Sequence, residues 1–253
     1  MKALTRQLVR VLALLLTAAL ALQIYFLARV ALMAWVDPQS TTFQRSEAWL
    51  LLTNKGEIRW RQQWVDYADL GETIKRAVIA SEDASFADHA GIDWDALERA
   101  WERNLSAQAR ADKANERQRP QAAGKAAPAR VRLVGGSTIT QQLAKNLFLS
   151  SDRSLARKAQ EFAITLMLEG LLSKRRILEI YLNSVEWGEG VFGAEAAAQH
   201  YFRVSARQLS AMQAAQLSVL LPAPKRFEKR PHSAYVLGRA GTVLARMPAV
   251  ETP

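Results

Sequence analysis

The chain of 253 residues contains no cysteine. This absence excludes a disulfide scaffold, thiolate metal ligands and a thiol nucleophile, but it leaves the cellular compartment open. The only histidines, His89, His200 and His232, lack the spacing of metal ligands, so no histidine metal site is expected. Glycine and proline are also sparse, with 12 and 8 residues, whereas 49% of residues are apolar. A collagen-like or disordered chain is therefore excluded, and one buried core is feasible.

Acidic residues are missing from the first 36 positions, and the positive charge is concentrated in three segments. The formal net charge is +10, and residues 1–36, 104–132 and 225–253 carry +4, +5 and +4. The remainder of the chain is therefore slightly acidic. Because the body of the protein is not basic, no nucleic-acid partner is expected.

One long apolar run occupies residues 11–28, where only Thr17 and Gln23 are polar. At about 1.5 Å per residue it nearly crosses a hydrocarbon core of about 30 Å, and residues 30–36 extend it if Arg29 reaches the interface. Basic residues precede the run. We therefore predict a single-pass helix in the inner (cytoplasmic) membrane, with a cytoplasmic N-terminus and a periplasmic remainder. A cleaved signal peptide is the alternative, although its small-residue site would fall inside the apolar run.

Patterning divides the rest of the chain. Alternating apolar residues at 43–65 predict a small extended region, and the spacing beyond it is helical almost to the end. No alternation of strands and helices is visible, which argues against a parallel sheet. The longer helices are predicted at 154–172, 174–182, 194–201 and 209–220. The alanine-rich, basic stretch at 104–134 predicts a mobile insert. We expect an anchor at 1–36, an extended membrane-proximal segment at 37–70, a main domain at 71–230 and a tail at 231–253.

Glu82 and Asp83 follow a short apolar helix and precede Phe86, His89 and Gly91. Desolvation beside Phe86 would raise a carboxyl pKa, as a general base near neutrality requires. An acidic helix end is the alternative interpretation.

A second polar segment runs from Gly135 to Asn146. The paired glycines allow unusual backbone geometry, Ser137 is a candidate N-cap, and Gln141 and Lys145 share one helix face. Amides and a cation at a helix start suit phosphate or sugar hydroxyls, while a capped surface helix is an equal alternative.

Arg153, Arg157 and Glu161 are spaced by four residues along one helix face. Ordinary surface ion pairing would contribute only about 0.3–0.5 kcal/mol per pair. However, arginine before glutamate is the poorer orientation, and an arginine in the first turn opposes the helix dipole by about 0.3–1 kcal/mol. Cations placed where they cost stability favour the binding of an anion.

The segment Gly188 to Gly193 has the letters of a dinucleotide fingerprint. It follows a helix instead of a strand, and no acid stands about twenty residues further on. We therefore reject a nucleotide site and expect a tight turn between helices.

In order, these motifs resemble the peptidoglycan glycosyltransferases, specifically the monofunctional biosynthetic transglycosylases related to the N-terminal half of class A penicillin-binding proteins. The matching residues are Glu82-Asp83 through Phe86, His89 and Gly91, then Gly135 to Asn146, Arg157-Lys158 with Glu161, Ile177-Leu178-Glu179 through Tyr181-Leu182-Asn183 to Gly193, and Leu221-Pro222-Ala223-Pro224. The resemblance covers about residues 70–225.

This resemblance implies a mainly α, lysozyme-like fold with head and jaw lobes, acting on lipid II. It implies that Glu82 is the base and that Lys145 and Arg153 contact the pyrophosphate. It also implies that Glu161 is a second catalytic glutamate, which organises either the donor pyrophosphate or a divalent ion, Mg²⁺ or Mn²⁺. The resemblance does not imply an essential cofactor. The remaining substrate-binding residues are implied to be Asp83, Phe86, His89, Ser137, Thr138, Gln141, Gln142, Asn146, Arg157 and Lys158.

The expected partners are lipid II, the growing glycan strand, the lipid bilayer, and cell-division or other peptidoglycan-synthesis proteins. A muramidase of the same fold is one alternative, but it does not explain two cations and an anchor together. A catalytically silent membrane scaffold is another, which the full set of polar motif residues argues against.

Overall fold

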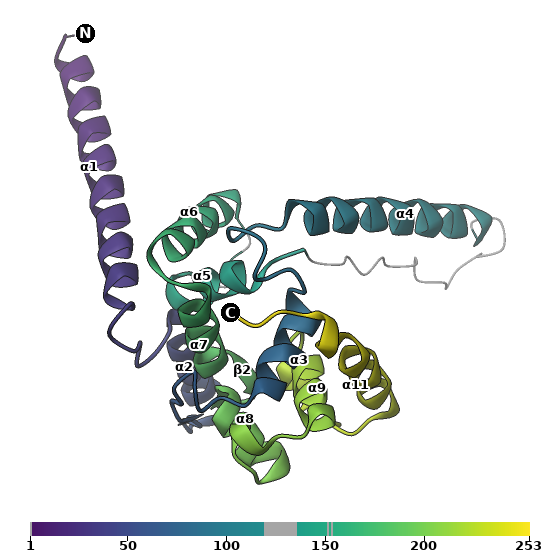
Figure 1. The fold of residues 1–253 in the computed structure, drawn as a ribbon. Coiled ribbons are helices and arrows are strands. Elements are labelled where there is room, and N and C mark those ends of the chain that lie inside the picture. Colours follow the sequence, from purple (N-terminus) through teal and green to yellow (C-terminus); the bar gives the residue numbers. More distant parts are fainter. Residues whose placement is uncertain (1, 119–135, 151, 153) are drawn as a thin grey trace. The chain divides into compact units, whose positions relative to one another are not determined.

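The computed structural model describes residues 2–118, 136–150, 152 and 154–253 (Figure 1). It forms two compact units, residues 1–91 with 139–253, and residues 92–138. Helices dominate the described residues, as predicted. The helices of the first unit are α1 (Lys2–Leu32), α2 (Thr42–Lys55), α3 (Glu72–Glu82), α5 (Ile139–Phe148), α6 (Leu155–Leu171), α7 (Lys174–Ser184), α8 (Ala194–Phe202), α9 (Ala211–Leu220), α10 (Pro224–Phe227) and α11 (Ala234–Arg246), with 3₁₀ turns η1 (Ala206–Gln208) and η2 (Met247–Ala249).

The extended region expected at residues 43–65 is wrong for its larger part, because α2 covers residues 42–55. Thr41 and Gln44 form a reciprocal capping box: Gln44 N donates to Thr41 Oγ1 at 3.1 Å, and Thr41 N donates to Gln44 Oε1 at 2.8 Å. Gly56 closes the helix in the left-handed region with φ 71°. Defined caps at both ends favour a helix over the strand that the alternating pattern indicated.

A small sheet has the order β1-β3-β2, formed by β1 (Arg61–Gln62), β2 (Glu186–Gly188) and β3 (Val191–Phe192). β1 pairs parallel with β3, but only over two residues of each strand. β2 and β3 form a hairpin between α7 and α8, which confirms the expected turn. A Cβ at Gly190 would lie 2.3 Å from the Arg59 carbonyl oxygen, so only glycine lets β1 approach.

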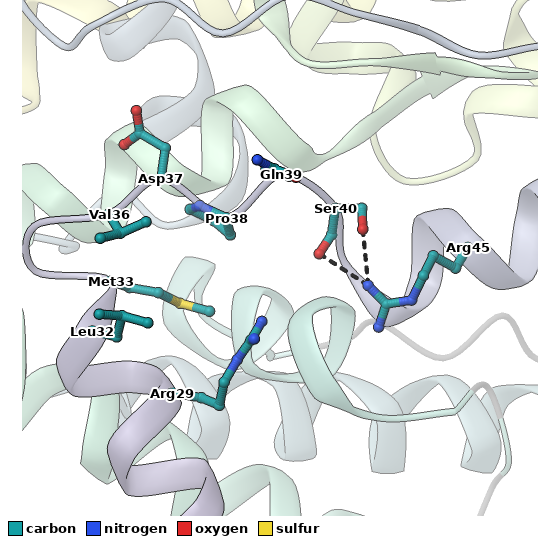
Figure 2. Close-up of a pocket in the computed structure, with 9 residues that line it drawn as sticks. All are labelled: Arg29, Leu32, Met33, Val36, Asp37, Pro38, Gln39, Ser40 and Arg45. Atoms are coloured by element: carbon teal, nitrogen blue, oxygen red, sulfur yellow. Dashed lines mark hydrogen bonds between the residues drawn. The ribbon is translucent and has the colours of Figure 1, made fainter.

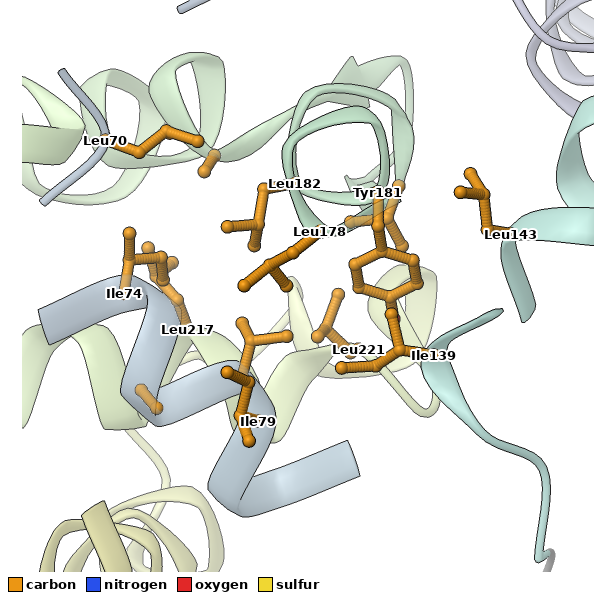
Figure 3. Close-up of a cluster of buried hydrophobic side chains, with 14 of the residues drawn as sticks. Leu70, Ile74, Ile79, Ile139, Leu143, Leu178, Tyr181, Leu182, Leu217 and Leu221 are labelled. Carbon is orange, nitrogen blue, oxygen red and sulfur yellow. The ribbon is translucent and has the colours of Figure 1, made fainter. Parts of the chain in front are cut away.

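The core joins the ends of three helices that carry motif residues (Figure 3). Ile79 of α3, Ile139 of α5 and Tyr181 of α7 have no exposed surface, and α9 and α11 cover α3. Burial of such side chains contributes about 1.5–3 kcal/mol each. The core therefore fixes the C-terminal end of α3 against the start of α5.

Helix α1 is joined to this core by its C-terminal turns. Gln23 and Gln160 of α6 exchange hydrogen bonds of 2.8 and 3.0 Å, and the Phe26 ring lies 5.2 Å from the Phe148 ring. Val30 is fully buried. The span Leu4–Leu32 is long and apolar enough to cross a membrane and is almost entirely exposed in the structure, which is compatible with a single-pass anchor.

The second unit contains helix α4 (Trp94–Gln118), which starts where Asp93 Oδ1 accepts from Ala96 N at 2.6 Å. The expected loop at 104–134 is therefore wrong for residues 104–118, which are helical. Alanine has the highest helix propensity, so an alanine-rich segment needs few large apolar residues to be helical. Residues 119–134 of the expected insert lie outside the described residues.

Candidate active site

Glu82, the last residue of α3, is held by a hydrogen-bonded chain of side chains. Gln142 of α5 donates from Nε2 to Glu82 Oε2 at 2.9 Å, and the hydroxyl of Tyr181 donates to Gln142 Oε1 at 2.9 Å. These two bonds fix the orientation of the Gln142 amide. Burial raises the pKa of Glu82, the hydrogen bonds from Gln142 and Ser81 lower it, and the charge of Asp83 raises it. The net shift is upward, which is the direction expected for a general base.

Tyr181 itself is fully buried. Burial first, and then the charges of Glu82 and Asp83, raise its pKa well above the usual value. The phenol therefore remains a hydrogen-bond donor over the whole physiological pH range. It fixes Gln142 without changing charge.

Asp83 connects His89 to the start of α5. His89 Nε2 lies 2.8 Å from Asp83 Oδ1, and Gly91 N donates to His89 Nδ1 at 3.1 Å. Because Nδ1 accepts, Nε2 carries the proton and donates to the carboxylate. The other carboxylate oxygen accepts from Ile139 N at 2.9 Å. Asp83 is thereby placed where the helix dipole stabilises a negative charge.

Ser137 is not adjacent to α5, because the helix begins at Ile139. The expected N-cap role is therefore wrong, and Asp83 supplies an acceptor for the first helical N–H instead. Ser137 and Thr138 belong to the second unit. Their expected contacts with substrate stay predictions.

Phe86 is fully buried, so in this structure it offers a substrate no surface. Its ring lies edge-on to His89 at 6.4 Å, and the Lys174 ammonium lies 4.5 Å from the ring centroid. Lys174 Nζ and Thr140 Oγ1 both donate to Glu169 Oε1, at 2.9 and 2.5 Å. Phe86 thus packs on the interior side of His89.

A cationic cluster lies on α5 and α6, made by Lys145, Arg157 and Lys158 around the buried Glu161. Arg157 Nη1 donates to Glu161 Oε2 at 2.6 Å, and Lys158 Nζ donates to Glu161 Oε1. Burial lowers the pKa of Lys145, the charge of Glu161 opposes this, and the charges of Arg157 and Lys158 add to it. Three cations thus surround one carboxylate.

The surroundings of Glu161 do not fit a bound divalent cation. Both carboxylate oxygens already accept from cationic side chains, and the third cation, Lys145, would repel Mg²⁺ or Mn²⁺. Among the described residues no group of three or more Asp, Glu or His side chains is arranged to hold a metal. Arg157 Nε is buried without a hydrogen-bond partner in the described part of the chain. The arrangement fits an anion better than a metal ion.

Among the other predicted site residues, Gln141 and Asn146 lie on α5 and are each 9% exposed. Arg153 lies outside the described residues. The sequence interpretation gave no role to Tyr181, Glu169 or Lys174. Only Tyr181 was part of a matched motif, and that membership was the one signal that could have identified it.

The sequence matches the family described as Transglycosylase over residues 51–114 and 118–248. It is also similar to proteins named biosynthetic peptidoglycan transglycosylase. The protein from Burkholderia lata is 48% identical over 93% of this chain and 87% of its own length. Those from Burkholderia thailandensis and Burkholderia pseudomallei are 48% identical over 93% of this chain and 84% of their own lengths.

The family match and these relatives define the class of protein as a group-transfer enzyme. The chain belongs to the transglycosylase family and is a glycosyltransferase. This result favours glycosyl transfer over the alternative of a silent scaffold.

Proposed function

We propose that this protein polymerises lipid II into β-1,4-linked glycan strands of peptidoglycan and releases undecaprenyl pyrophosphate. Family membership supports the glycosyl transfer. The observation that carries the proposal is that one helix, α5, bears both Gln142, which is bonded to the Glu82 carboxyl, and Lys145 of the cationic cluster. Transfer of a sugar from a pyrophosphate donor requires a base for the attacking hydroxyl and a site that binds the leaving pyrophosphate.

In the proposed step, Glu82 removes the proton of the acceptor's 4-hydroxyl. The hydroxyl oxygen forms a bond to the anomeric carbon of the donor while the bond from that carbon to the pyrophosphate oxygen breaks. The bonding electron pair leaves with the pyrophosphate. Direct displacement of an α-linked pyrophosphate inverts the anomeric carbon, which gives a β bond.

The leaving pyrophosphate is a stable anion and requires cations instead of a proton donor. Lys145 and Arg157 are the described cations that we assign to it, and Arg153 is assigned on the resemblance. The buried Glu161 holds Arg157 and Lys158 in place through its two oxygens. Preorganised charges of this kind stabilise developing negative charge without reorganisation during the reaction.

Gln142 and Tyr181 position the base. An amide held at both ends keeps the Glu82 carboxylate in one orientation, and its hydrogen bond limits the rise in pKa. Asp83, His89 and Gly91 then tie the chain after Glu82 to the first turn of α5. We assign the remaining predicted residues Gln141, Asn146, Ser137 and Thr138 to substrate binding.

We further propose that α1 anchors the enzyme in the inner membrane with its N-terminus in the cytoplasm and the catalytic unit in the periplasm. The support is the apolar span Leu4–Leu32 and the basic residues before it. The anchor keeps the enzyme at the surface where a lipid-linked substrate resides.

The test is incubation of the detergent-purified full chain with labelled lipid II, followed by gel separation of the products. The proposal predicts glycan strands and their loss in the presence of moenomycin. Cleavage of finished glycan without polymerisation would show a muramidase and would overturn it.

A further inference from the structure

A cavity of about 360 Å³ lies where the chain leaves α1 and enters α2 (Figure 2). It is lined by Arg29, Leu32, Met33, Val36, Asp37, Pro38, Gln39, Ser40 and Arg45. None of these residues takes part in the reaction proposed above.

Two arginines give the cavity its charge. Arg29, in the last turn of α1, forms no hydrogen bond or ion pair with any residue that the structure describes. Arg45 donates from Nη1 to the carbonyl and hydroxyl oxygens of Ser40 at 3.1 and 2.9 Å, and from Nη2 to Thr42 Oγ1 at 3.1 Å. These acceptors are all neutral, so neither guanidinium has an anionic partner among the described residues.

The acid of the cavity lining, Asp37, is already neutralised. Arg176 of α7 donates to Asp37 Oδ1 at 2.6 Å, and Figure 2 shows the Asp37 side chain pointing away from Arg29 and Arg45. The two guanidiniums therefore make the cavity a site for an anion. Planar guanidiniums bind phosphate oxygens through paired, charge-assisted hydrogen bonds.

One wall of the cavity is apolar, and the cavity lies at the end of the candidate membrane span. Leu32, Met33 and Val36 line this side, and Leu32 is the last residue of the candidate span. Trp35, next to them, is 83% exposed, and exposed tryptophan is typical of the level of lipid head groups. An anion that also has an apolar tail fits both walls.

We propose that this cavity binds the phosphate of a membrane lipid, with Arg29 and Arg45 on the phosphate and the apolar wall on the first carbons of the lipid tail. The proposal rests on the membrane anchor inferred under the proposed function. A phospholipid and a lipid-linked pyrophosphate share this chemistry. Either ligand would fix the height of the catalytic unit above the bilayer.

Native mass spectrometry of the full chain in neutral detergent tests the proposal. The protein is titrated with phosphatidylglycerol, with diacylglycerol, which has similar tails but no phosphate, and with undecaprenyl pyrophosphate. The variants are Arg29→Gln and Arg45→Gln, with Arg29→Lys to restore the charge. Arg239→Gln on α11, an exposed site with the same charge change, is the matched control.

We expect the wild type and Arg239→Gln to retain phosphatidylglycerol but not diacylglycerol. Arg29→Gln and Arg45→Gln should each weaken retention about tenfold, the loss of one charge-assisted contact. Arg29→Lys should recover part of it. Arg45→Gln removes hydrogen bonds to Ser40 and Thr42 and can alter the turn there. Arg29→Gln breaks no hydrogen bond or ion pair to a described residue, so this variant measures ligand binding without that change.

The proposal would be overturned if neither phosphate lipid were retained, if wild type and Arg29→Gln retained the bound phosphate lipid equally, or if diacylglycerol were retained as well as that lipid. Arginine-dependent retention of undecaprenyl pyrophosphate alone would support it and identify the lipid-linked substrate class as the ligand. Phosphatidylglycerol donates no sugar, so this binding is measured independently of polymerisation. A chain that binds the lipid but makes no glycan would contradict only the proposed function.

Discussion

Gln142 Nε2 lies 2.9 Å from Glu82 Oε2, and this bond crosses from α5 to the end of α3. The same amide accepts from the Tyr181 hydroxyl at 2.9 Å. A carboxyl that is otherwise desolvated is therefore held by a neutral donor whose own orientation is fixed by a buried phenol. This relay fixes the position of the proposed base and opposes the rise in its pKa that burial causes.

Replacing Gln142 by alanine should shift the acidic limb of the pH profile of kcat/KM to higher pH. The hydrogen bond from Gln142 lowers the pKa of Glu82, so its removal lets burial raise that pKa further, and less of the base is ionised at a given pH. Tyr181→Phe should shift the limb in the same direction but less, because Gln142 remains. An unchanged limb in both variants would contradict the relay.

Lys145→Ala should reduce kcat/KM for the pyrophosphate donor with little loss of thermal stability. Lys145 experiences the repulsive charges of Arg157 and Lys158, and an incoming anion offsets this repulsion. Arg157→Ala should reduce both activity and stability, because it leaves one oxygen of the buried Glu161 unpaired. Steady-state kinetics and melting curves separate the two effects. A sharp loss of stability with unchanged turnover in Lys145→Ala would mean that Lys145 is structural.

The helices that carry the motifs follow from the sequence, whereas Glu82 as the base stays a prediction from the family resemblance. The way the site assembles does not follow from the sequence. Spacing predicted helices close to the observed α6, α7, α8 and α9, because an apolar stripe at helical period is a local signal. Glu82, Gln142 and Tyr181 come from three separate helices, and only tertiary packing brings them together. The weak alternation of apolar residues wrongly predicts strands at α2, because the caps at Thr41 and Gly56 favour a helix more strongly.

Truncation should depend strongly on where α1 is cut. Removing residues 1–21 keeps Gln23, Phe26 and Val30, which pack on the catalytic unit, so the melting temperature in detergent should change little. Removing residues 1–36 deletes these contacts and should lower it clearly, since loss of one large buried side chain costs about 2–5 kcal/mol. Equal melting temperatures of the two truncated proteins would show that α1 does not belong to the core.

Glu186 of β2 makes stability depend on pH. It is 5% exposed, and burial raises its pKa to about 8; Lys225 opposes this rise, and the charges of Glu47, Glu228 and Glu189 add to it. The folded state binds the proton more tightly than the unfolded state, whose pKa is near 4.5. The resulting stabilisation is complete below that value and is lost as the pH rises through about 8.

Glu186→Gln mimics the neutral form and should be more stable than wild type at about pH 8.5, with a smaller difference at about pH 5. Melting curves at both values measure the difference. Lys225 retains its ion pair with Glu47 in the variant, which limits side effects. A variant that is less stable than wild type at the higher pH would contradict the raised pKa.

The assignment of Glu82 as the base is tested most directly by measuring lipid II polymerisation by Glu82→Gln in the full chain. Glu72→Gln, the same substitution at an exposed site on the same helix α3, is the matched control. Glu82→Gln should keep the helical circular dichroism of wild type but lose at least about 10²-fold in the rate of glycan formation, as expected when a positioned base is removed. Glu72→Gln should polymerise like wild type. Polymerisation by a folded Glu82→Gln within about threefold of wild type would contradict the assignment of Glu82 as the base.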